Sequence, residues 1–254
     1  MVESSRARTV LITGAGQGVG QGIALAFAAK GDNIVLAGRT LSKLEETAKL
    51  IDERGAGQAH CVTCDVKSAE SLSNMVDEAV RAFGTIDVLV NNAQEVPMGT
   101  LDQVTDEKFL AGFESGPLAT LRLMKLAKPH LAKSNGVVVN LVSSAMKRWD
   151  MSGYGAYAAV KQAIRSLTRA AAAEWGSDGI RVLNIAPHAE SPGLVGWAKQ
   201  NPDEAAAFFK TIPLGRVGAL ETDIGEAVVS LCAPEMGYLT GATIPLDGGQ
   251  ANFD

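Results

Sequence analysis

Short apolar segments alternate with helix-like segments along the whole chain, and this alternation limits the fold more than any other feature. Strands are predicted at 9–13, 33–37, a segment ending at Cys64, 86–90, 136–142, 180–186 and 243–246. Helices are predicted at 22–30, 42–54, 68–83, 105–133, 153–175 and 222–232, and less regular helices within 191–218. Continuously apolar strands between helices are typical of a parallel sheet covered on both faces. The sequence therefore predicts an α/β fold with a doubly wound, Rossmann-like sheet of about seven strands.

The length and charge of the chain narrow the range of functions. A chain of 254 residues without linkers or repeats fits one α/β domain. Its formal net charge of −5 argues against nucleic acid or an anionic membrane as the main partner, because both select basic surfaces. No apolar run reaches the roughly 18 residues that span a bilayer, and the first residues have no signal-peptide core. We expect a cytoplasmic protein.

Three cysteines include one isolated CxxC pair, Cys61 and Cys64. A zinc site needs a second pair or histidines at matching spacing. A redox CxxC should open a helix, whereas this pair ends a predicted strand. We therefore expect a buried thiol pair and no metal site.

A glycine-rich turn follows the first predicted strand and opens a predicted helix. It lacks the Gly-Lys-Ser/Thr of a P-loop and the spacing of G-x-G-x-x-G, but it fits T-G-x-x-x-G-x-G through Thr13, Gly14, Gly18 and Gly20. Glycines here let a diphosphate approach the free N–H groups of a helix N-terminus. We predict dinucleotide binding; the alternative is a tight strand-to-helix connection.

The end of the second strand, where the cofactor ribose is recognised in such folds, reads Gly38-Arg39-Thr40. A carboxylate there would repel a 2′-phosphate, whereas the planar fork of Arg39 suits one. The sequence favours NADP(H), with NAD(H) as the other nicotinamide cofactor. The alternative reading of Arg39 is a solvated surface side chain.

Tyr157 and Lys161 stand four residues apart, so on a helix they share one face. The pKa of free tyrosine is near 10, and a neighbouring ammonium favours the phenolate and brings the pKa toward the working range of an acid–base. Ser144 follows the preceding strand at the sheet edge where ligands bind. The alternative for the Tyr–Lys pair is simple packing of the ring on the lysine stem.

With these motifs together, the chain resembles the short-chain dehydrogenase/reductase family in its compact single-domain form, over essentially its whole length. The motifs that carry the resemblance are TGAGQGVG from Thr13, Asp65-Val66, Asn91-Asn92-Ala93, Ser144, Tyr157-x-x-x-Lys161, residues 184–187 and the tail 240–249.

The resemblance implies a role for each of these residues. Tyr157 is the expected acid–base, Ser144 orients the carbonyl oxygen, and Lys161 holds the nicotinamide ribose and lowers the pKa of Tyr157. Hydride would pass between the nicotinamide and a ketone or secondary alcohol. The expected cofactor-binding residues are Gly14, Gln17, Gly18, Val19, Gly20, Arg39, Thr40, Asp65, Val66, Asn91, Ala93, Tyr157, Lys161 and Pro187.

The resemblance also implies an overall organisation. Residues 1–254 would form one NAD(P)-binding domain with substrate loops at about 94–100, 145–153 and 187–218. A homotetramer is expected, with the helix 157–175 and the C-terminal strand at its interfaces. The loops favour a medium-sized, apolar carbonyl or alcohol substrate. The expected substrate contacts are Gln94, Val96, Met146, Trp149, Met151, His188 and Trp197.

Three positions depart from the family pattern. Gln94 and His188 stand where the family has glycine, and Phe113 stands where it has an asparagine that kinks a helix and holds a water near the lysine. Two other function classes therefore stay open. One is a cofactor-independent lyase like the halohydrin dehalogenases, although these replace the lysine and lose the glycine loop. The other is a non-catalytic NADP-binding sensor or scaffold.

Overall fold

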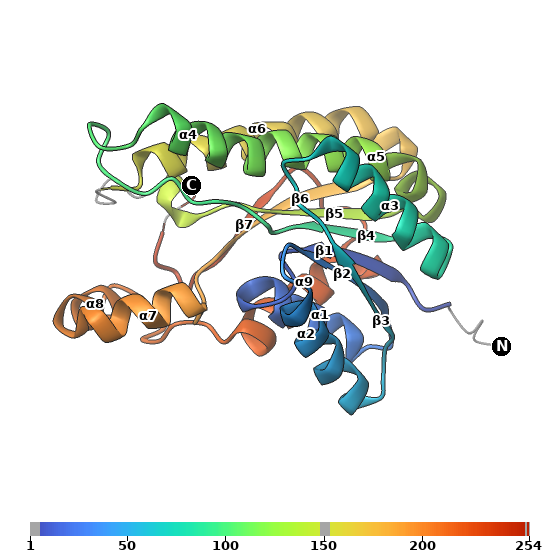
Figure 1. Cartoon of the computed structure of the whole chain (residues 1–254), viewed down its shortest axis with the longest axis horizontal. Coiled ribbons are helices and arrows are strands. Elements are labelled where there is room, and N and C mark those ends of the chain that lie inside the picture. The colour runs from blue at the N-terminus through green and yellow to red at the C-terminus, as the bar shows by residue number, and fades with distance from the viewer. Residues whose placement is uncertain (1–5, 148–152, 252, 254) are drawn as a thin grey trace.

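The sheet of the protein is parallel throughout, as predicted from the alternation of apolar segments. The computed structural model describes residues 6–147, 153–251 and 253. Within them, seven strands form one sheet in the order β3-β2-β1-β4-β5-β6-β7, and each neighbouring pair is parallel (Figure 1). The strands are β1 Thr9–Thr13, β2 Asn33–Gly38, β3 Ala59–Thr63, β4 Val88–Asn91, β5 Val137–Leu141, β6 Arg181–Pro187 and β7 Thr243–Leu246.

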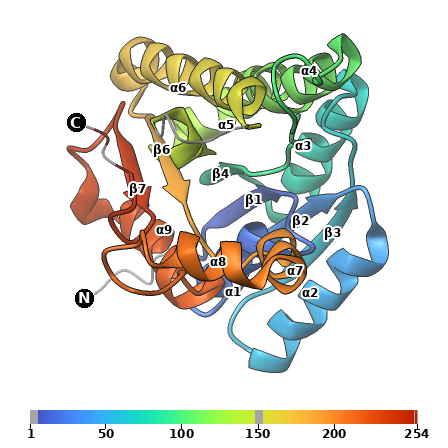
Figure 2. The ribbon, with the colours of Figure 1, turned by 90° about the vertical axis from the view of Figure 1, so that its left-hand side faces the viewer.

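Helices cover both faces of this sheet, which confirms the predicted doubly wound, Rossmann-like fold. Figure 1 shows α3, α4, α5 and α6 on one face and α1, α2 and α9 on the other. In Figure 2, α7 and α8 lie in front of the other elements, at the edge to which β6 leads. The bounds are α1 Gly18–Ala28, α2 Leu41–Arg54, α3 Ala69–Phe83, α4 Asp106–Phe113, α5 Ala119–Ser134, α6 Gly155–Trp175, α7 Pro192–Gln200, α8 Pro202–Phe209 and α9 Glu226–Leu231.

Alternate residues of each central strand enter two separate hydrophobic cores. Val10 and Ile12 of β1 pack toward α1, α2 and α9, whereas Leu11 between them packs toward α3, α5 and α6. All three are fully buried. This is why the strands are continuously apolar rather than alternating, since both faces are covered.

Two predicted helices are interrupted by π-helical segments. The predicted helix 105–133 is divided by Glu114–Leu118 (η1), which contains Pro117. The first part of the predicted helix 222–232 lies in the π-helical segment Leu220–Gly225 (η4), and the rest continues as α9. Proline removes a backbone donor from the helix interior, so the hydrogen-bond pattern locally lengthens around it. The predicted helical region 105–133 is helical over 106–134, with a π-helical segment inside it.

A chain of buried side-chain hydrogen bonds joins α6 to the sheet. Asn91 donates to Asn140 (2.8 Å), Asn140 donates to Thr168 of α6 (2.8 Å), and Thr168 donates to Asn184 (2.6 Å). Asn184 in turn donates to Thr243 of β7 (3.2 Å). A buried donor left unpaired is costly, so this network specifies how β4, β5, β6, β7 and α6 fit together.

The three cysteines are free thiols. Cys64 is buried and Cys61 partly buried, and burial raises the pKa of both. Among the described residues no cluster of His, Cys, Asp and Glu could hold a metal ion, and no helix is long and apolar enough to cross a membrane.

Close approach of α1 to η4 gives a test of the packing. A Cβ added to Gly22 would lie 2.3 Å from the backbone oxygen of Leu220, whereas one added to Gly196 of α7 would meet nothing within 4 Å. Gly22→Ala should therefore lower the free energy of unfolding by about 1–3 kcal/mol. Gly196→Ala should raise it by up to about 1 kcal/mol, because alanine favours a helix over glycine. Urea unfolding of both variants checks this; equal stability of Gly22→Ala and the wild type would contradict it.

Candidate active site

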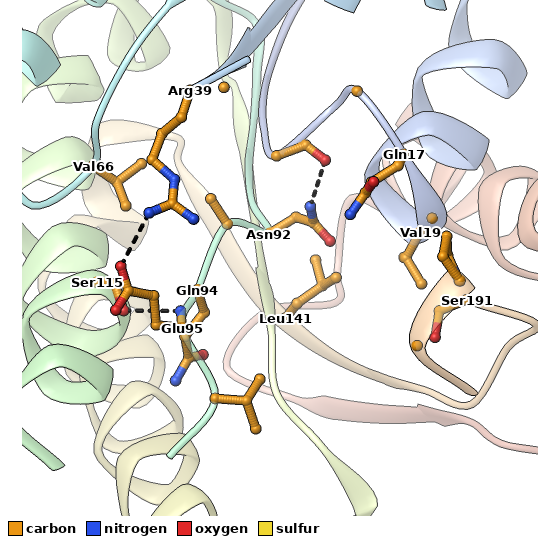
Figure 3. A pocket seen from close by; sticks show the side chains of 18 of the residues that line it. Gln17, Val19, Arg39, Val66, Asn92, Gln94, Glu95, Ser115, Leu141 and Ser191 are labelled. Carbon is orange, nitrogen blue, oxygen red and sulfur yellow. Dashed lines mark hydrogen bonds and ion pairs between the residues drawn. The ribbon is translucent and has the colours of Figure 1, made fainter. Parts of the chain in front are cut away.

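A cavity lies at the carboxyl edge of the sheet, where strand order reverses between β1 and β4. Such a crevice is where open α/β sheets bind ligands. The cavity has a volume of about 580 Å³ and is lined by loops that follow β1, β2, β3, β4, β5 and β6. Figure 3 shows side chains from several of these loops around one space, among them Gln17, Arg39, Gln94 and Leu141.

The glycine loop has no room for side chains at its turns. Gly14 and Gly18 have φ values of +67° and +60°, which other L-residues rarely adopt. A Cβ on Gly20 would lie 2.4 Å from the backbone oxygen of Gly14. The loop leads into α1 at Gly18, and the N-cap Gln17 makes no side-chain capping bond there. The first N–H groups of α1 therefore form an anion-binding end facing the cavity.

Hydrogen bonds fasten this loop to the end of β4. The Thr13 hydroxyl accepts from the backbone N–H groups of Asn92 and Ala93, each at 3.0 Å. The Asn92 amide donates to the backbone oxygens of Thr13 (2.8 Å) and Gly14 (3.1 Å). We call these four bonds the Thr13–Asn92 clasp. It fixes the two walls of the crevice relative to each other.

Lys161 and Tyr157 lie on the face of α6 that borders the cavity. Lys161 is 4% exposed, and its Nζ donates to the backbone oxygen of Leu141 at 2.6 Å. The same Nζ lies 5.5 Å from the centroid of the Tyr157 ring. Burial lowers the pKa of Lys161 to about 7 and raises the pKa of Tyr157 to about 12, while the Ser143 hydroxyl opposes the shift at Tyr157. Burial thus favours the neutral form of both groups.

The two serines after β5, Ser143 and Ser144, have different surroundings. Ser144 is buried and donates to Asp247 at 2.8 Å, and it does not line the cavity. Ser143 lines the cavity, and its side-chain hydrogen bond with Tyr157 lowers the pKa of that phenol. The Ser144 hydroxyl is directed to the buried Asp247 carboxylate, which is a stronger acceptor than a neutral group would be. The role of Ser144 toward a carbonyl oxygen stays a prediction.

Phe113 does not reach the cavity either. It is 41% exposed and lies beside Phe109, with ring centroids 6.4 Å apart. The interior position is taken by Ser115 of η1, which donates to the backbone oxygen of Ala111 (2.6 Å) and accepts from the N–H of Glu95 (3.0 Å). Ser115, not Phe113, is therefore the side chain of this segment that lines the cavity.

Most predicted cofactor residues line the cavity. The exceptions are Gly20, which lies behind the glycine turn, and Asn91, which belongs to the buried network below it. Those that line it are Gly14, Gln17, Gly18, Val19, Arg39, Thr40, Asp65, Val66, Ala93, Tyr157, Lys161 and Pro187.

Only part of the predicted substrate set reaches the same cavity. Gln94 and Val96 line it, and both polar atoms of the Gln94 amide are buried without a hydrogen-bond partner in the part of the chain described. His188 lines a second cavity of about 480 Å³. Met146 packs against Val142 and Ile164, and Trp197 lies against Phe208. Trp149 and Met151 lie outside the described residues.

Six polar residues line the cavity without having been predicted as site residues: Lys43, Asn92, Glu95, Ser115, Ser143 and Ser191. Asn92 stands inside the Asn-Asn-Ala motif, of which only Asn91 and Ala93 were predicted to bind the cofactor. Glu95 follows β4 and Ser115 lies in η1. Neither belongs to a sequence motif, so no residue spacing indicated them.

The sequence and fold can be compared with known proteins at this point. A sequence model of the family described as Enoyl-(Acyl carrier protein) reductase matches residues 14–251. The chain is 36% identical over 249 residues to the 12alpha-hydroxysteroid dehydrogenase of a Clostridium species, which covers 95% of this chain and 96% of the relative. The chain belongs to the short-chain dehydrogenase/reductase family.

Solved members of the short-chain dehydrogenase/reductase family have the same fold. A 7 alpha-hydroxysteroid dehydrogenase complexed with NADH and 7-oxo glycochenodeoxycholic acid matches with a TM-score of 0.88 and 29% identity, over 96% of this chain and 94% of that one. A 3-ketoacyl-(acyl-carrier-protein) reductase from Brucella melitensis, complexed with NADH, matches with a TM-score of 0.86 and 28% identity, over 96% and 98%. The protein is an NAD(P)-dependent alcohol dehydrogenase or carbonyl reductase of this family.

The residues of the cavity fit a nicotinamide cofactor. Side-chain-free backbone at Gly14 and Gly18 and the open N-terminus of α1 suit the diphosphate. The unpartnered amide of Gln94 leaves hydrogen-bonding groups for a ligand in the same space.

The buried Lys161 gives the cofactor-free protein a distinct pH dependence. The folded chain releases the Lys161 proton near pH 7, whereas the unfolded chain keeps it to about pH 10.4. The unfolded state binds more protons in between, so stability rises with pH from about 7 to 10. We expect the unfolding free energy of the wild type, relative to Lys161→Met, to increase by up to about 1.4 kcal/mol per pH unit in this range.

Denaturant unfolding between pH 6 and 9 measures this difference. The matched control is Lys125→Met, which removes an exposed lysine of α5 and should give a difference independent of pH. A difference that is flat for Lys161→Met as well would contradict the expectation.

Proposed function

We propose that the protein is an NADP(H)-dependent oxidoreductase that interconverts an apolar ketone and its secondary alcohol, with Tyr157 as the acid–base. The observation that carries this proposal is that Tyr157 and Lys161 lie side by side at the cavity. Both belong to α6, which the buried hydrogen bonds of Thr168 join to the sheet. The bound nicotinamide would supply or accept the hydride. All other steps are assigned to residues of this chain.

Tyr157 carries the proton in this proposal. With its pKa raised by burial, the phenol is neutral at pH 7 and can donate its proton to a carbonyl oxygen as the alcohol forms. In the opposite direction the phenol must first lose its proton, and a protonated Lys161 within reach of the ring would favour that form. Lys161 also offers N–H groups to a ribose hydroxyl.

A hydroxyl of the Ser143–Ser144 pair orients the substrate oxygen in this scheme. Family resemblance assigns the role to Ser144, whereas the geometry brings Ser143 closer to Tyr157. Ser144 would have to release Asp247 to act on the substrate.

The substrate class follows from the lining and the relatives. Val96 lines the cavity and Met98, in the same loop, is 52% exposed, so an apolar ligand finds contacts there. Relatives named for hydroxysteroids have the same fold and length. We therefore propose ketones and secondary alcohols of medium size up to sterol size as substrates.

We also propose that residues 1–254 act as one domain and assemble as a homotetramer. Support for assembly comes from α4, where Phe109, Leu110 and Phe113 are 37%, 55% and 41% exposed. Exposed apolar side chains gathered on one helix are typical of an interaction face.

Replacing Tyr157 tests the chemistry. Tyr157→Phe removes one oxygen and keeps the ring, so we expect kcat to fall at least 100-fold while the affinity for NADPH changes less than threefold. Steady-state kinetics on a panel of ketones and calorimetric titration of NADPH give the two values. Unchanged turnover would remove Tyr157 from the mechanism, and absence of turnover in the wild type with intact binding would favour a sensor.

The same kinetic measurements show which of the two serines orients the substrate oxygen. Ser143→Ala and Ser144→Ala should differ, with one losing at least tenfold in kcat and the other staying within threefold. Small effects in both would show that neither hydroxyl orients the substrate.

Cofactor preference is the second test of the proposed function. A charge-assisted contact is worth about 1.5–3 kcal/mol, so Arg39 predicts that NADPH binds roughly 10- to 150-fold more tightly than NADH. Arg39→Gln should bring the two affinities within about threefold. Side-by-side titrations measure them; equal affinities in the wild type would contradict the NADP(H) assignment and leave the family membership intact.

A further inference from the structure

One carboxylate bridges two cations at the rim of the cavity. Oε1 of Glu95 accepts from Nη1 of Arg39 at 3.2 Å and lies 2.9 Å from Nζ of Lys67. Figure 3 shows the Arg39 fork directed at Glu95 rather than into open space. Arg39, the residue expected to hold a phosphate, is thus already paired within the chain.

The three residues come from the ends of three different strands. Arg39 follows β2, Lys67 follows β3 and Glu95 follows β4. Because β1 lies between β2 and β4 in the sheet, the ion pair passes across the crevice above β1. Arg39 and Glu95 both line the cavity there, at the strand end where a cofactor ribose is recognised.

The position of Glu95 is held by its backbone. Its N–H donates to the Ser115 hydroxyl at 3.0 Å, and that hydroxyl donates to the backbone oxygen of Ala111 at 2.6 Å. The side chains of Glu95 and Lys67 are 34% and 31% exposed, so solvent screens their interaction only in part. The loop thus presents the carboxylate to the two cations from a fixed anchor.

Charges at this rim are balanced without a ligand. Arg39 and Lys67 contribute two positive charges, and Glu95 and Asp65 contribute two negative ones. Asp65 is held beside Lys67 by the backbone N–H of Lys67, which donates to its carboxylate at 3.0 Å. The hydrogen bond to Glu95 raises the pKa of Lys67, which shows how closely the two groups interact. An incoming dianion therefore meets no excess of positive charge among these four groups while Glu95 stays in place.

We propose that Glu95 determines cofactor specificity, as an internal anion that occupies Arg39 and Lys67 and that a cofactor 2′-phosphate must displace. Lys67 is then a second cation of the phosphate site. NADH carries no 2′-phosphate and binds without this exchange. The inference rests on the proposed NADP(H) function and deepens it, because it makes the affinity for NADPH the outcome of a competition within the site.

Removing the charge of Glu95 tests the inference. An exposed ion pair is worth up to about fivefold in an equilibrium constant, and loss of a like charge beside the phosphate adds to this. Glu95→Gln should therefore bind NADPH and adenosine 2′,5′-bisphosphate about tenfold more tightly than the wild type does. Its affinities for NADH and adenosine 5′-monophosphate should stay within about twofold. Calorimetric titration of the purified full chain measures all four.

Glu53→Gln is the matched control. Glu53 lies at the far end of α2 from Arg39, is 59% exposed and pairs with Lys49, so this variant has the same change in net charge away from the cavity. It should leave all four affinities unchanged. An equal gain in NADPH affinity for Glu53→Gln and Glu95→Gln would reduce the effect to overall charge and overturn the proposal.

Two other results would also overturn it. If Glu95→Gln tightens NADPH and NADH equally, Glu95 covers the adenosine rather than competing with the phosphate. If it changes neither, the ion pair has no part in cofactor binding. Adenosine 2′,5′-bisphosphate keeps the test independent of the nicotinamide end of the site.

A double variant separates this inference from the proposed function. In the Arg39→Gln background, the gain from Glu95→Gln should shrink, because one of the two contested cations is missing. A full gain in that background would overturn the proposed competition for Arg39. If Arg39→Gln alone leaves the ratio of NADPH to NADH affinity unchanged, the role of Arg39 in selecting NADP(H) fails, whatever Glu95→Gln shows. Equal affinities of the wild type for NADPH and NADH would instead overturn the NADP(H) assignment itself.

Discussion

The Thr13–Asn92 clasp is the contact on which the rest of the site depends. It joins the ends of β1 and β4, the two strands between which the order of the sheet reverses. The glycine loop on one side and the loop with Gln94 and Glu95 on the other both start from it. Because its donors and acceptors are backbone groups and two short side chains, it leaves little freedom for the width of the crevice. The loop that leads into α1 and the loop that carries Glu95 are therefore joined where they leave the sheet.

Much of this arrangement could be predicted from sequence, for a physical reason. A parallel sheet buried on both faces requires continuously apolar strands, and residues such as Val10, Leu11 and Ile12 show that requirement directly. The glycine turn and the Tyr157–Lys161 spacing are equally local, because backbone conformation and helical periodicity link residues close in sequence. Carboxyl ends of parallel strands meet at one edge, so the gathering of these motifs in one cavity follows from the fold.

What could not be predicted depends on competition between side chains far apart in sequence. Ser144 points to Asp247, a residue 103 positions later in the chain, and no local pattern indicates that choice. Arg39 pairs with Glu95, which carries no motif and lies two strands away in the sheet. Phe113 stands at the position where the family has an asparagine, but its side chain is exposed, and Ser115 of the π-helical segment is buried instead. In each case the partner is decided by tertiary packing.

The buried chain from Asn91 through Asn140, Thr168 and Asn184 to Thr243 has a consequence for how the site can change. Thr168 lies two helical turns from Lys161 on the same face of α6, so its two hydrogen bonds set the rotation of this helix about its axis. This network across the sheet positions Tyr157 and Lys161 independently of the loops that surround them. The loops after β4, β5 and β6 can then be lengthened, exchanged or recombined to admit different molecules, while Tyr157 keeps its position.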